Sequence, residues 1–420
     1  MRRRRLLVAL AAVPFGFLFG TCIAIDSLGG AFRSAPSELL SPAPGKGLSP
    51  AARALLARVA HGIDPARALD VHTHVVGIGR GGTGAEVNPR MRSFASPFHH
   101  YKFLVYCSAA GIDDLERADE RYVERLVELA RHAVPRARHV VLAFDHHYSE
   151  DGAIDLVHTE FYVPNDHALA VAGAHPELFL AGGSVHPYRA DALAELDRLA
   201  ARGVRLIKWL PNAMGIDPAS ARCDGFYAKL LEHRMVLLTH TGDEQAVDAE
   251  EMQGLGNPLR LRRALDAGVT VIAAHCASRG TDEDLDRADR ARVSSFGLFL
   301  RLLGEARYAG RLFGDISAMT QFNRCGEPLA TLLAREDLQP RLVNGSDYPL
   351  PAINVLVRLG ALVEAGYLDA ADADPMREIY DHNPLAFDFA LKRALRSPAT
   401  GRGFADVVFH DRPELGILAR

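Results

Sequence analysis

The strongest constraint on the fold is a repeated pairing of a short apolar run with a helix-like segment. Eight such runs each end in polar residues: Leu69–Gly77, His139–His147, Leu178–Tyr188, Val204–Pro211, Met235–Asp243, Val269–Ser278, Leu312–Thr320 and Arg341–Pro349. The segments between them are rich in Ala, Leu, Arg and Glu, and several carry apolar residues at helical spacing. Strands that alternate with helices form parallel βαβ units. We therefore predict an α/β fold, a (β/α)8 TIM barrel, with a doubly wound open sheet as the alternative.

The connection after the first predicted strand, residues 78–138, is much longer than the others. A loop of that length in a compact domain usually covers or lines a binding site, so we expect a lid. Gly77, Gly79 and Gly82 match the spacing of a dinucleotide-binding turn, but the residues that follow have the composition of a loop. Because that turn requires a helix to begin there, dinucleotide binding is not expected.

The N-terminus has the pattern of a membrane segment. Four arginines at positions 2–5 precede twenty uncharged residues, which are enough to cross a bilayer core as a helix. The arginines favour a cytoplasmic N-terminus and so a membrane-anchored protein with its catalytic domain outside the cytoplasm, or an exported one if the segment is cleaved. The predicted divisions are a signal-anchor over 1–25, a flexible linker over 26–50, a catalytic barrel over 51–395 and a tail over 396–420.

Composition narrows the classes of function. The net charge of −4 gives no electrostatic basis for binding nucleic acid. The five cysteines are scattered, so they indicate neither a disulfide framework nor a cysteine-type zinc module.

Lysine is scarce, with five lysines against 43 arginines, and Lys208 lies inside an apolar predicted strand. Because a buried amine can lose its proton and a guanidinium cannot, Lys208 is a candidate metal or substrate group.

Polar side chains stand at the ends of the predicted strands, where the active sites of barrels lie. His72 and His74 are two residues apart, so both point to one face of the first strand. His240, His275 and Asp347 stand at the ends of the fifth, sixth and eighth strands. Imidazole and carboxylate groups bind divalent transition metals, and two unpaired imidazoles in an apolar run would otherwise be costly to bury. These residues therefore predict a metal centre at one end of the barrel.

Several of these segments resemble the amidohydrolase superfamily, most closely its amidohydrolase-related branch. The resemblance covers roughly residues 66–390, and its elements are DVHTH at Asp70–His74, LLTHTGDE around His240, IAAHCAS around His275, GSDYP at Gly345–Pro349 and the closing segment Asn383–Phe387. It implies that a catalytic divalent metal, with zinc as the expected ion, is bound by His72, His74, His240 and Asp347. It also implies that His275 binds a second metal or polarises the substrate. Lys208 stands where members with two metals place a carboxylated lysine, so one or two ions remain open.

The chemistry expected from these residues is hydrolysis. A bound divalent metal lowers the pKa of its water to near 7, and Asp347 beside that water can take its proton and pass it to the leaving group. The metal, with His275 or a second ion, stabilises the developing oxyanion. We expect a metal-dependent hydrolase of an amide, ester, lactone or similar carbonyl bond in a small molecule. A decarboxylase with the same metal site is the nearest alternative, and a barrel that binds a ligand without turnover is a third.

Four further polar residues at strand ends are candidates for binding the substrate: His147, His186, Asp243 and Arg279. Each could instead be a hydrogen-bonded or solvated loop residue. The sequence names no substrate, and it leaves the oligomeric state open, including a homo-oligomer.

Overall fold

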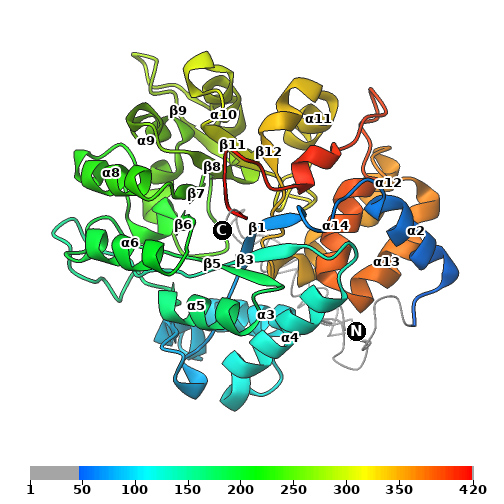
Figure 1. Cartoon of the computed structure of the whole chain (residues 1–420), viewed down its shortest axis with the longest axis horizontal. Helices are drawn as coiled ribbons and strands as arrows, with labels where there is room; N and C mark the ends of the chain where they lie inside the picture. Colours follow the sequence, from blue (N-terminus) through cyan, green and yellow to red (C-terminus); the bar gives the residue numbers. More distant parts are fainter. Residues whose placement is uncertain (1–46, 419–420) are drawn as a thin grey trace, which may run out of the picture.

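The computed structural model of the protein describes residues 47–418, and eight parallel strands form its centre (Figure 1). They belong to two sheets, one with the order β1-β3-β5 and one with the order β12-β11-β8-β7-β6. The strands are β1 (Leu69–His74), β3 (Arg138–Leu142), β5 (Phe179–Gly182), β6 (Leu206–Trp209), β7 (Val236–His240), β8 (Val271–Ala274), β11 (Leu312–Asp315) and β12 (Leu342–Val343). Each predicted apolar run contains one of these strands, which confirms an α/β fold with parallel strands.

Two seams join the sheets into a ring. At one seam Thr73 of β1 bridges to Tyr348, just after β12, and at the other Gly183, just after β5, bridges to Ile207 of β6. Both bridges are parallel, and the backbone N–H of Lys208 donates to the carbonyl of Gly183 at 2.7 Å. The strands therefore follow one another around a closed barrel, so that their carboxyl ends face one side of the molecule.

Helices surround the ring (Figure 1). They are α2 (Pro50–Ala60), α3 (Pro97–Ala110), α4 (Ala118–His132), α5 (Asn165–Ala174), α6 (Ala192–Ala201), α7 (Pro211–Met214), α8 (Asp224–Glu232), α9 (Arg262–Ala267), α10 (Ser295–Gly304), α11 (Glu327–Ala334), α12 (Leu359–Glu364), α13 (Ala373–His382) and α14 (Pro384–Ala394). Four short strands lie outside the barrel: β2 (Glu86–Val87), β4 (Phe161–Tyr162), β9 (Thr281–Glu283) and β10 (Arg292–Ser294).

Local sequence explains where these helices begin and which face they bury. Helix α6 buries Ala192, Leu196 and Leu199, whose spacing of three or four places them on one face. Asn383 precedes helix α14, which begins at Pro384, and its side-chain oxygen accepts the N–H groups of Leu385 and Ala386 in the first turn. The Asn383 side chain also donates to the carbonyl of Leu129 in α4 at 2.9 Å. This asparagine therefore caps one helix and ties it to another.

The interior of the barrel changes from apolar to polar along the strands. Side chains alternate with a period of two, so Leu206 and Lys208 of β6 lie on one face, as do Leu238 and His240 of β7. Leu206 and Leu238 belong to the apolar cluster of the barrel, which Leu415 from the C-terminal segment also joins. The polar partner of each pair lies nearer the carboxyl end of its strand. An apolar core at one end thus supports a polar layer at the other.

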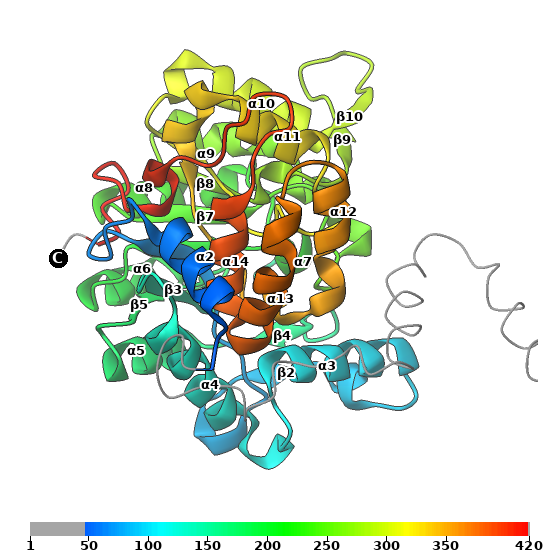
Figure 2. The ribbon, with the colours of Figure 1, turned by 90° about the vertical axis from the view of Figure 1, so that its right-hand side faces the viewer.

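The connection between β1 and β3 is the long insertion that the sequence predicted. It contains β2, which pairs antiparallel with β4, and the helix α3 (Figure 2). We did not predict α3, because its buried residues Phe103, Val105 and Cys107 are two apart and so lack a helical pattern. The helix packs against turns on two sides, Pro89–Arg92 and Leu350–Ala352, which explains why more than one face is apolar.

The prediction of a membrane-anchored protein is corrected by the structure. Within residues 47–418, every helix is too short or too polar to cross a bilayer. The segment 1–25 on which the prediction rested lies outside the described residues, as does the linker up to residue 46.

The predicted limits of the barrel domain at residues 51 and 395 remain predictions. Helix α2 packs against α13 and α14. Beyond residue 395, Leu415 and Ile417 join the apolar cluster of the barrel. The segment beyond residue 395 therefore contributes to the core of the barrel.

Candidate metal centre and active site

Polar side chains from the strand ends meet at one cavity of about 140 Å³. We call its polar side the floor, which consists of His72, His74, Lys208, His240, Glu244, His275 and Asp347. The remaining lining residues are mostly apolar, and we call them the wall. The structure thus brings together all six residues that the sequence predicted as metal ligands. Their binding of a metal remains a prediction.

The two histidines of β1 are placed by a break in strand register. The register of β1 against β3 shifts between Asp70 and Thr73. The Asp70 carboxylate accepts the backbone N–H groups of His72 at 3.0 Å and Ser346 at 2.9 Å, which ties β1 to the loop after β12. The rings of His72 and His74 then lie with centroids 5.1 Å apart. As the sequence predicted, both point to one face.

The backbone is unusual at two floor residues. His275 and Asp347 have φ angles of 56° and 60°, in the left-handed region that residues other than glycine rarely adopt. The N–H of Asp347 donates to the carbonyl of His72 at 2.6 Å. Gly345 lies so close to His72 that a Cβ atom added at Gly345 would stand 2.6 Å from the His72 Cβ. Backbone strain of this kind persists where the surrounding structure holds it, and it is frequent at functional sites.

Three floor histidines have their Nδ1 atoms paired away from the centre. His72 Nδ1 lies 2.8 Å from Asp315 Oδ2, and His240 Nδ1 lies 3.2 Å from Glu244 Oε2. His275 Nδ1 lies 2.8 Å from Ser317 Oγ. A neutral imidazole that donates from Nδ1 keeps a lone pair on Nε2. This is how proteins orient histidines that bind metals.

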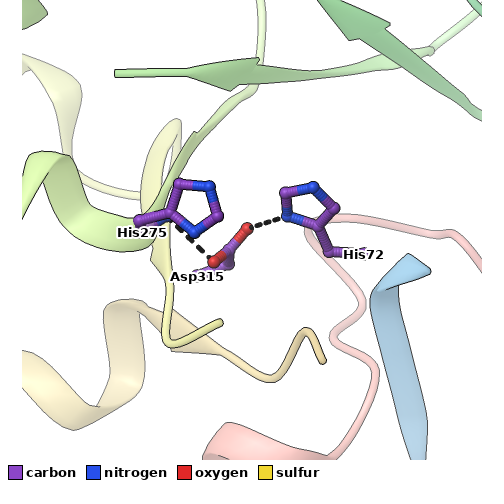
Figure 3. Close-up of side chains that lie close together, drawn as sticks. All are labelled: His72, His275 and Asp315. Carbon is purple, nitrogen blue, oxygen red and sulfur yellow. Dashed lines mark hydrogen bonds and ion pairs between the residues drawn. The ribbon is translucent and has the colours of Figure 1, made fainter. Parts of the chain in front are cut away.

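Asp315 contacts two of these histidines, the ring of His72 and the backbone of His275, as Figure 3 shows. Besides its contact with His72, its carboxylate accepts the backbone N–H of His275 at 3.0 Å and that of Ser317 at 2.9 Å. The Ser317 hydroxyl also donates to it. His72, His275 and Asp315 are close enough to hold a metal between them. Because the lone pairs of Asp315 are already occupied, however, we interpret this group as a support for the floor.

The Nε2 atoms of the floor turn toward Asp347. Asp347 Oδ1 lies 3.2 Å from His74 Nε2 and 3.4 Å from His72 Nε2, and its Oδ2 lies 3.9 Å from His275 Nε2. Lys208 Nζ lies 2.9 Å from His72 Nε2. His240 Nε2 is buried and has no hydrogen-bond partner within the described residues. An unpaired buried nitrogen among imidazoles and a carboxylate fits a divalent metal, since that set matches its preferred ligands.

Electrostatics favour the protonation states that metal binding requires. Burial lowers the pKa of His74, and it lowers the pKa of His240 to about 4. Burial also lowers the pKa of Lys208. For Asp347 burial acts in the opposite direction, but the charge of His72 and the hydrogen bond of His74 lower its pKa overall. Neutral imidazoles and an ionised carboxylate are the forms that bind metals.

The four residues that the sequence predicted to bind the substrate lie outside the lining of the cavity. Within the described part of the chain, His147, His186, Asp243 and Arg279 are absent from the lining of the cavity. His186 is fully buried, with Nε2 at 2.8 Å from the Met214 carbonyl and Nδ1 accepting the N–H of Tyr188 at 3.1 Å. Their role in substrate binding therefore remains a prediction without a contact in the cavity.

His147 and Arg279 also have identifiable surroundings. His147 Nδ1 lies 2.9 Å from the carbonyl of Ala213. Burial lowers the pKa of Arg279, and the charges of Asp243 and Glu244 oppose that shift. The arginine, which lies outside the cavity lining, is thus close to Asp243 and to Glu244 of the floor. These contacts hold loops in place behind the floor.

Three residues near the floor were not singled out from the sequence: Asp315, Ser317 and Arg324. Asp315 could have been found, because it follows Phe313 at the inward spacing of two and ends a predicted strand. Ser317 and Arg324 follow the strand without a periodic pattern. Arg324 is buried, donates to Ser278 Oγ at 3.2 Å, and has its pKa lowered by burial.

Comparison with known proteins gives a family and several similar structures. The family model described as amidohydrolase matches residues 69–387. Among solved structures, the chain is similar to an uncharacterized TIM-barrel protein from Bordetella bronchiseptica (16% identity, TM-score 0.43, covering 76% of this chain and 99% of that one). It is also similar to 5-carboxyvanillate decarboxylase from Sphingomonas paucimobilis (11% identity, TM-score 0.42, covering 69% and 92%). A third is 5-carboxyvanillate decarboxylase from Novosphingobium aromaticivorans with bound manganese (12% identity, TM-score 0.41, covering 78% and 94%). No curated protein matches the chain in sequence.

Proposed function

The chain belongs to the amidohydrolase family, and on this premise we propose that it is a metal-dependent hydrolase that cleaves an amide, ester, lactone or similar carbonyl bond in a small molecule. The observation that carries this proposal is the convergence of three imidazoles on one carboxylate, with a fourth imidazole in the same cavity lining. Three of their Nε2 atoms lie within 3.9 Å of Asp347, and the fourth, of His240, is buried without a partner in the described residues.

His72, His74, His240 and Asp347 are the proposed ligands of a divalent metal, with zinc as the preferred ion. Nitrogen ligands with one carboxylate suit zinc and similar transition metals. When bound, the metal supplies Lewis acidity and lowers the pKa of water to near neutral. Asp315 and Glu244 fix the orientation of two ligand rings through their Nδ1 atoms.

The chain's own residues then handle the proton and the developing charge. Asp347 takes a proton from the attacking water and returns it to the leaving oxygen or nitrogen as the carbonyl bond breaks. The products are a carboxylic acid and an alcohol or amine, and the carboxylate of Asp347 is regenerated. His275, held by Ser317, lies on the Oδ2 side of Asp347 and stabilises the oxyanion of the substrate.

The number of metal ions per chain, one or two, depends in this proposal on whether Lys208 is carboxylated. Its amine lies 2.9 Å from His72 Nε2, and burial lowers its pKa, so a neutral amine that can be carboxylated is accessible. If it is carboxylated, Lys208→Ala loses one metal per chain, and added short-chain carboxylic acid restores activity. Unchanged metal content in this variant would assign a single-metal site.

Decarboxylation at the same centre is the alternative. A carboxylic acid substrate needs cationic groups around its carboxylate. Of the described residues that line the cavity, Lys208 is the single lysine or arginine, and its amine contacts His72. Away from the proposed metal, a substrate carboxylate would therefore have Lys208 as its single cationic side chain in the described lining.

The test is a screen of the zinc-reconstituted protein with esters, lactones and amides, in which acid release is followed by titration. We expect about one or two metals per chain and hydrolysis of at least one class, lost in Asp347→Asn. Carbon dioxide release from carboxylated substrates, without hydrolysis, would assign the decarboxylase instead. Absence of bound metal, together with unchanged activity in His72→Ala, would reject both reactions.

A further inference from the structure

The wall of the cavity has a different chemistry from its floor. It is formed by side chains from the insertion, including Ile78, Val87 and Phe103, and from the segment after β3, including Phe144 and Phe161. These elements are far apart in the sequence and are joined by the β2–β4 pair. The wall is therefore an apolar surface that faces the reacting groups.

The polar atoms of the wall are already engaged. The Tyr106 hydroxyl donates to the carbonyl of Ala246. Burial raises the pKa of the Cys107 thiol to about 11, so the thiol is neutral. Glu244, at the edge of the floor, pairs with His240 and accepts the N–H of Val247 at 3.1 Å. The Tyr106 hydroxyl therefore has no proton left to donate to a polar substituent.

The charged groups behind the wall pair with one another. Lys102 Nζ lies 2.9 Å from Glu160 Oε1, and Glu160 is buried. Glu160 also accepts the backbone N–H of Asp248. Lys102 and Glu160 do not line the cavity within the described residues, and neither do Arg279 and Arg324. A carboxylate carried by the substrate would therefore be desolvated against apolar side chains, which is costly.

We propose, building on the hydrolase assignment, that the substrate is a neutral compound whose part remote from the reacting carbonyl is a single aromatic ring or an aliphatic group of that size. The apolar wall limits the size, because the cavity of about 140 Å³ includes the space at the floor. An engineered apolar cavity of about 150 Å³ in another protein binds benzene. The class is thus neutral aryl or short alkyl esters, lactones and amides, whose polar atoms are confined to the bond that meets the floor.

The first experiment compares phenyl butyrate with 4-carboxyphenyl butyrate on the zinc-reconstituted protein. The two esters differ by one carboxylate at the far side of the ring, and each rate is divided by that of alkaline hydrolysis. We expect kcat/KM to be at least about 100-fold higher for the neutral ester, because the unpaired carboxylate is desolvated on binding. Equal or faster cleavage of the carboxylated ester would overturn the proposal and leave the hydrolase assignment intact.

A substitution in the wall tests the cause of this preference. Val87 of β2 lines the cavity and is half-buried, so Val87→Lys can extend its amine to the mouth. We expect Val87→Lys to raise kcat/KM for the carboxylated ester, relative to that for the neutral ester, about tenfold. Val87→Met should leave this ratio of kcat/KM values unchanged. Ile112→Lys and Ile112→Met form a second matched pair if the first variant does not fold. An unchanged ratio in both folded lysine variants would contradict an apolar wall as the cause.

A binding measurement separates this proposal from the hydrolase assignment. Benzohydroxamic acid and 4-carboxybenzohydroxamic acid present the same group to a metal and differ by the distal carboxylate. Titration calorimetry on the zinc-loaded protein should show at least tenfold tighter binding of the neutral compound. If neither ester is hydrolysed but this order holds, aryl esters are rejected as substrates and the preference for a neutral distal group stands. The screen of esters, lactones and amides then decides the hydrolase assignment. If both bind equally, the substrate class is rejected.

Discussion

Three buried histidines of the floor differ from the buried His186 in what their ring nitrogens contact. In the floor, the Nδ1 atoms of His72, His240 and His275 pair with side chains, and the Nε2 atoms face the cavity. In His186, both ring nitrogens contact the backbone. A histidine with one free nitrogen can bind a metal, whereas one with two backbone partners holds loops together. Among these four histidines, the partners of the ring distinguish the three of the floor from His186.

The largest effect should come from removing a ring of the floor. His72→Ala removes a proposed ligand and the partner of both Asp315 and Lys208. We expect loss of metal and a fall in hydrolysis on the order of 1,000-fold or more, because the metal supplies several kcal/mol of transition-state stabilisation. Elemental analysis and ester assays measure both. His186→Gln is the matched control and should keep its metal. If both variants lose metal equally, the distinction between the floor histidines and His186 is wrong.

The second prediction concerns the pH dependence of stability that His186 contributes. Burial lowers the pKa of His186 to about 4, below the usual value near 6.5. A depressed folded pKa means that its contribution is complete above pH 6.5 and is lost as the pH falls through 4. Between pH 7 and pH 4 we expect the free energy of unfolding to fall by about 3 kcal/mol from this group.

Urea unfolding of the wild type and of His186→Gln across this range measures the difference. The glutamine side chain does not titrate, so the variant should lose stability less steeply than the wild type. Parallel curves would show that His186 has the same pKa in the folded and the unfolded protein, contrary to the effect of its burial.

A smaller effect is expected from the carboxylate that supports the floor. Asp315→Asn keeps the size of the side chain but removes the charge that accepts from His72 and His275. Partners of this kind typically change metal affinity by about 10–100-fold. Competition with a chromogenic chelator measures the affinity. Asp243→Asn, outside the cavity lining, is the control and should bind metal like the wild type.

The smallest effect is expected from Ser317→Ala. The hydroxyl lies 2.8 Å from His275 Nδ1, but the carbonyl of Ser317 lies 3.3 Å from the same atom and can replace it. We expect kcat to fall by only a few-fold, on the scale of one neutral hydrogen bond of about 1 kcal/mol. A loss as large as that of His72→Ala would mean that the hydroxyl itself acts in the reaction.

Much of the barrel and its floor could be predicted because both follow local periodicity. The eight apolar runs each contain a strand, and alternation along β6 and β7 places Lys208 and His240 inward. The insertion was recognised by its length alone. Helix α3 was missed because it packs on two sides, which removes the one-sided pattern that identifies a surface helix.

The sequence by itself determined the order of strands and helices and the identity of the polar residues at the strand ends, since these depend on neighbours a few positions apart. Only the tertiary structure decided which of those residues meet. His72 and Asp315 are 243 positions apart, and their 2.8 Å contact fixes which nitrogen of His72 faces the cavity. The apolar wall likewise exists only where the insertion folds against the segment after β3. Contacts between distant segments depend on how the barrel closes, which local pattern does not encode.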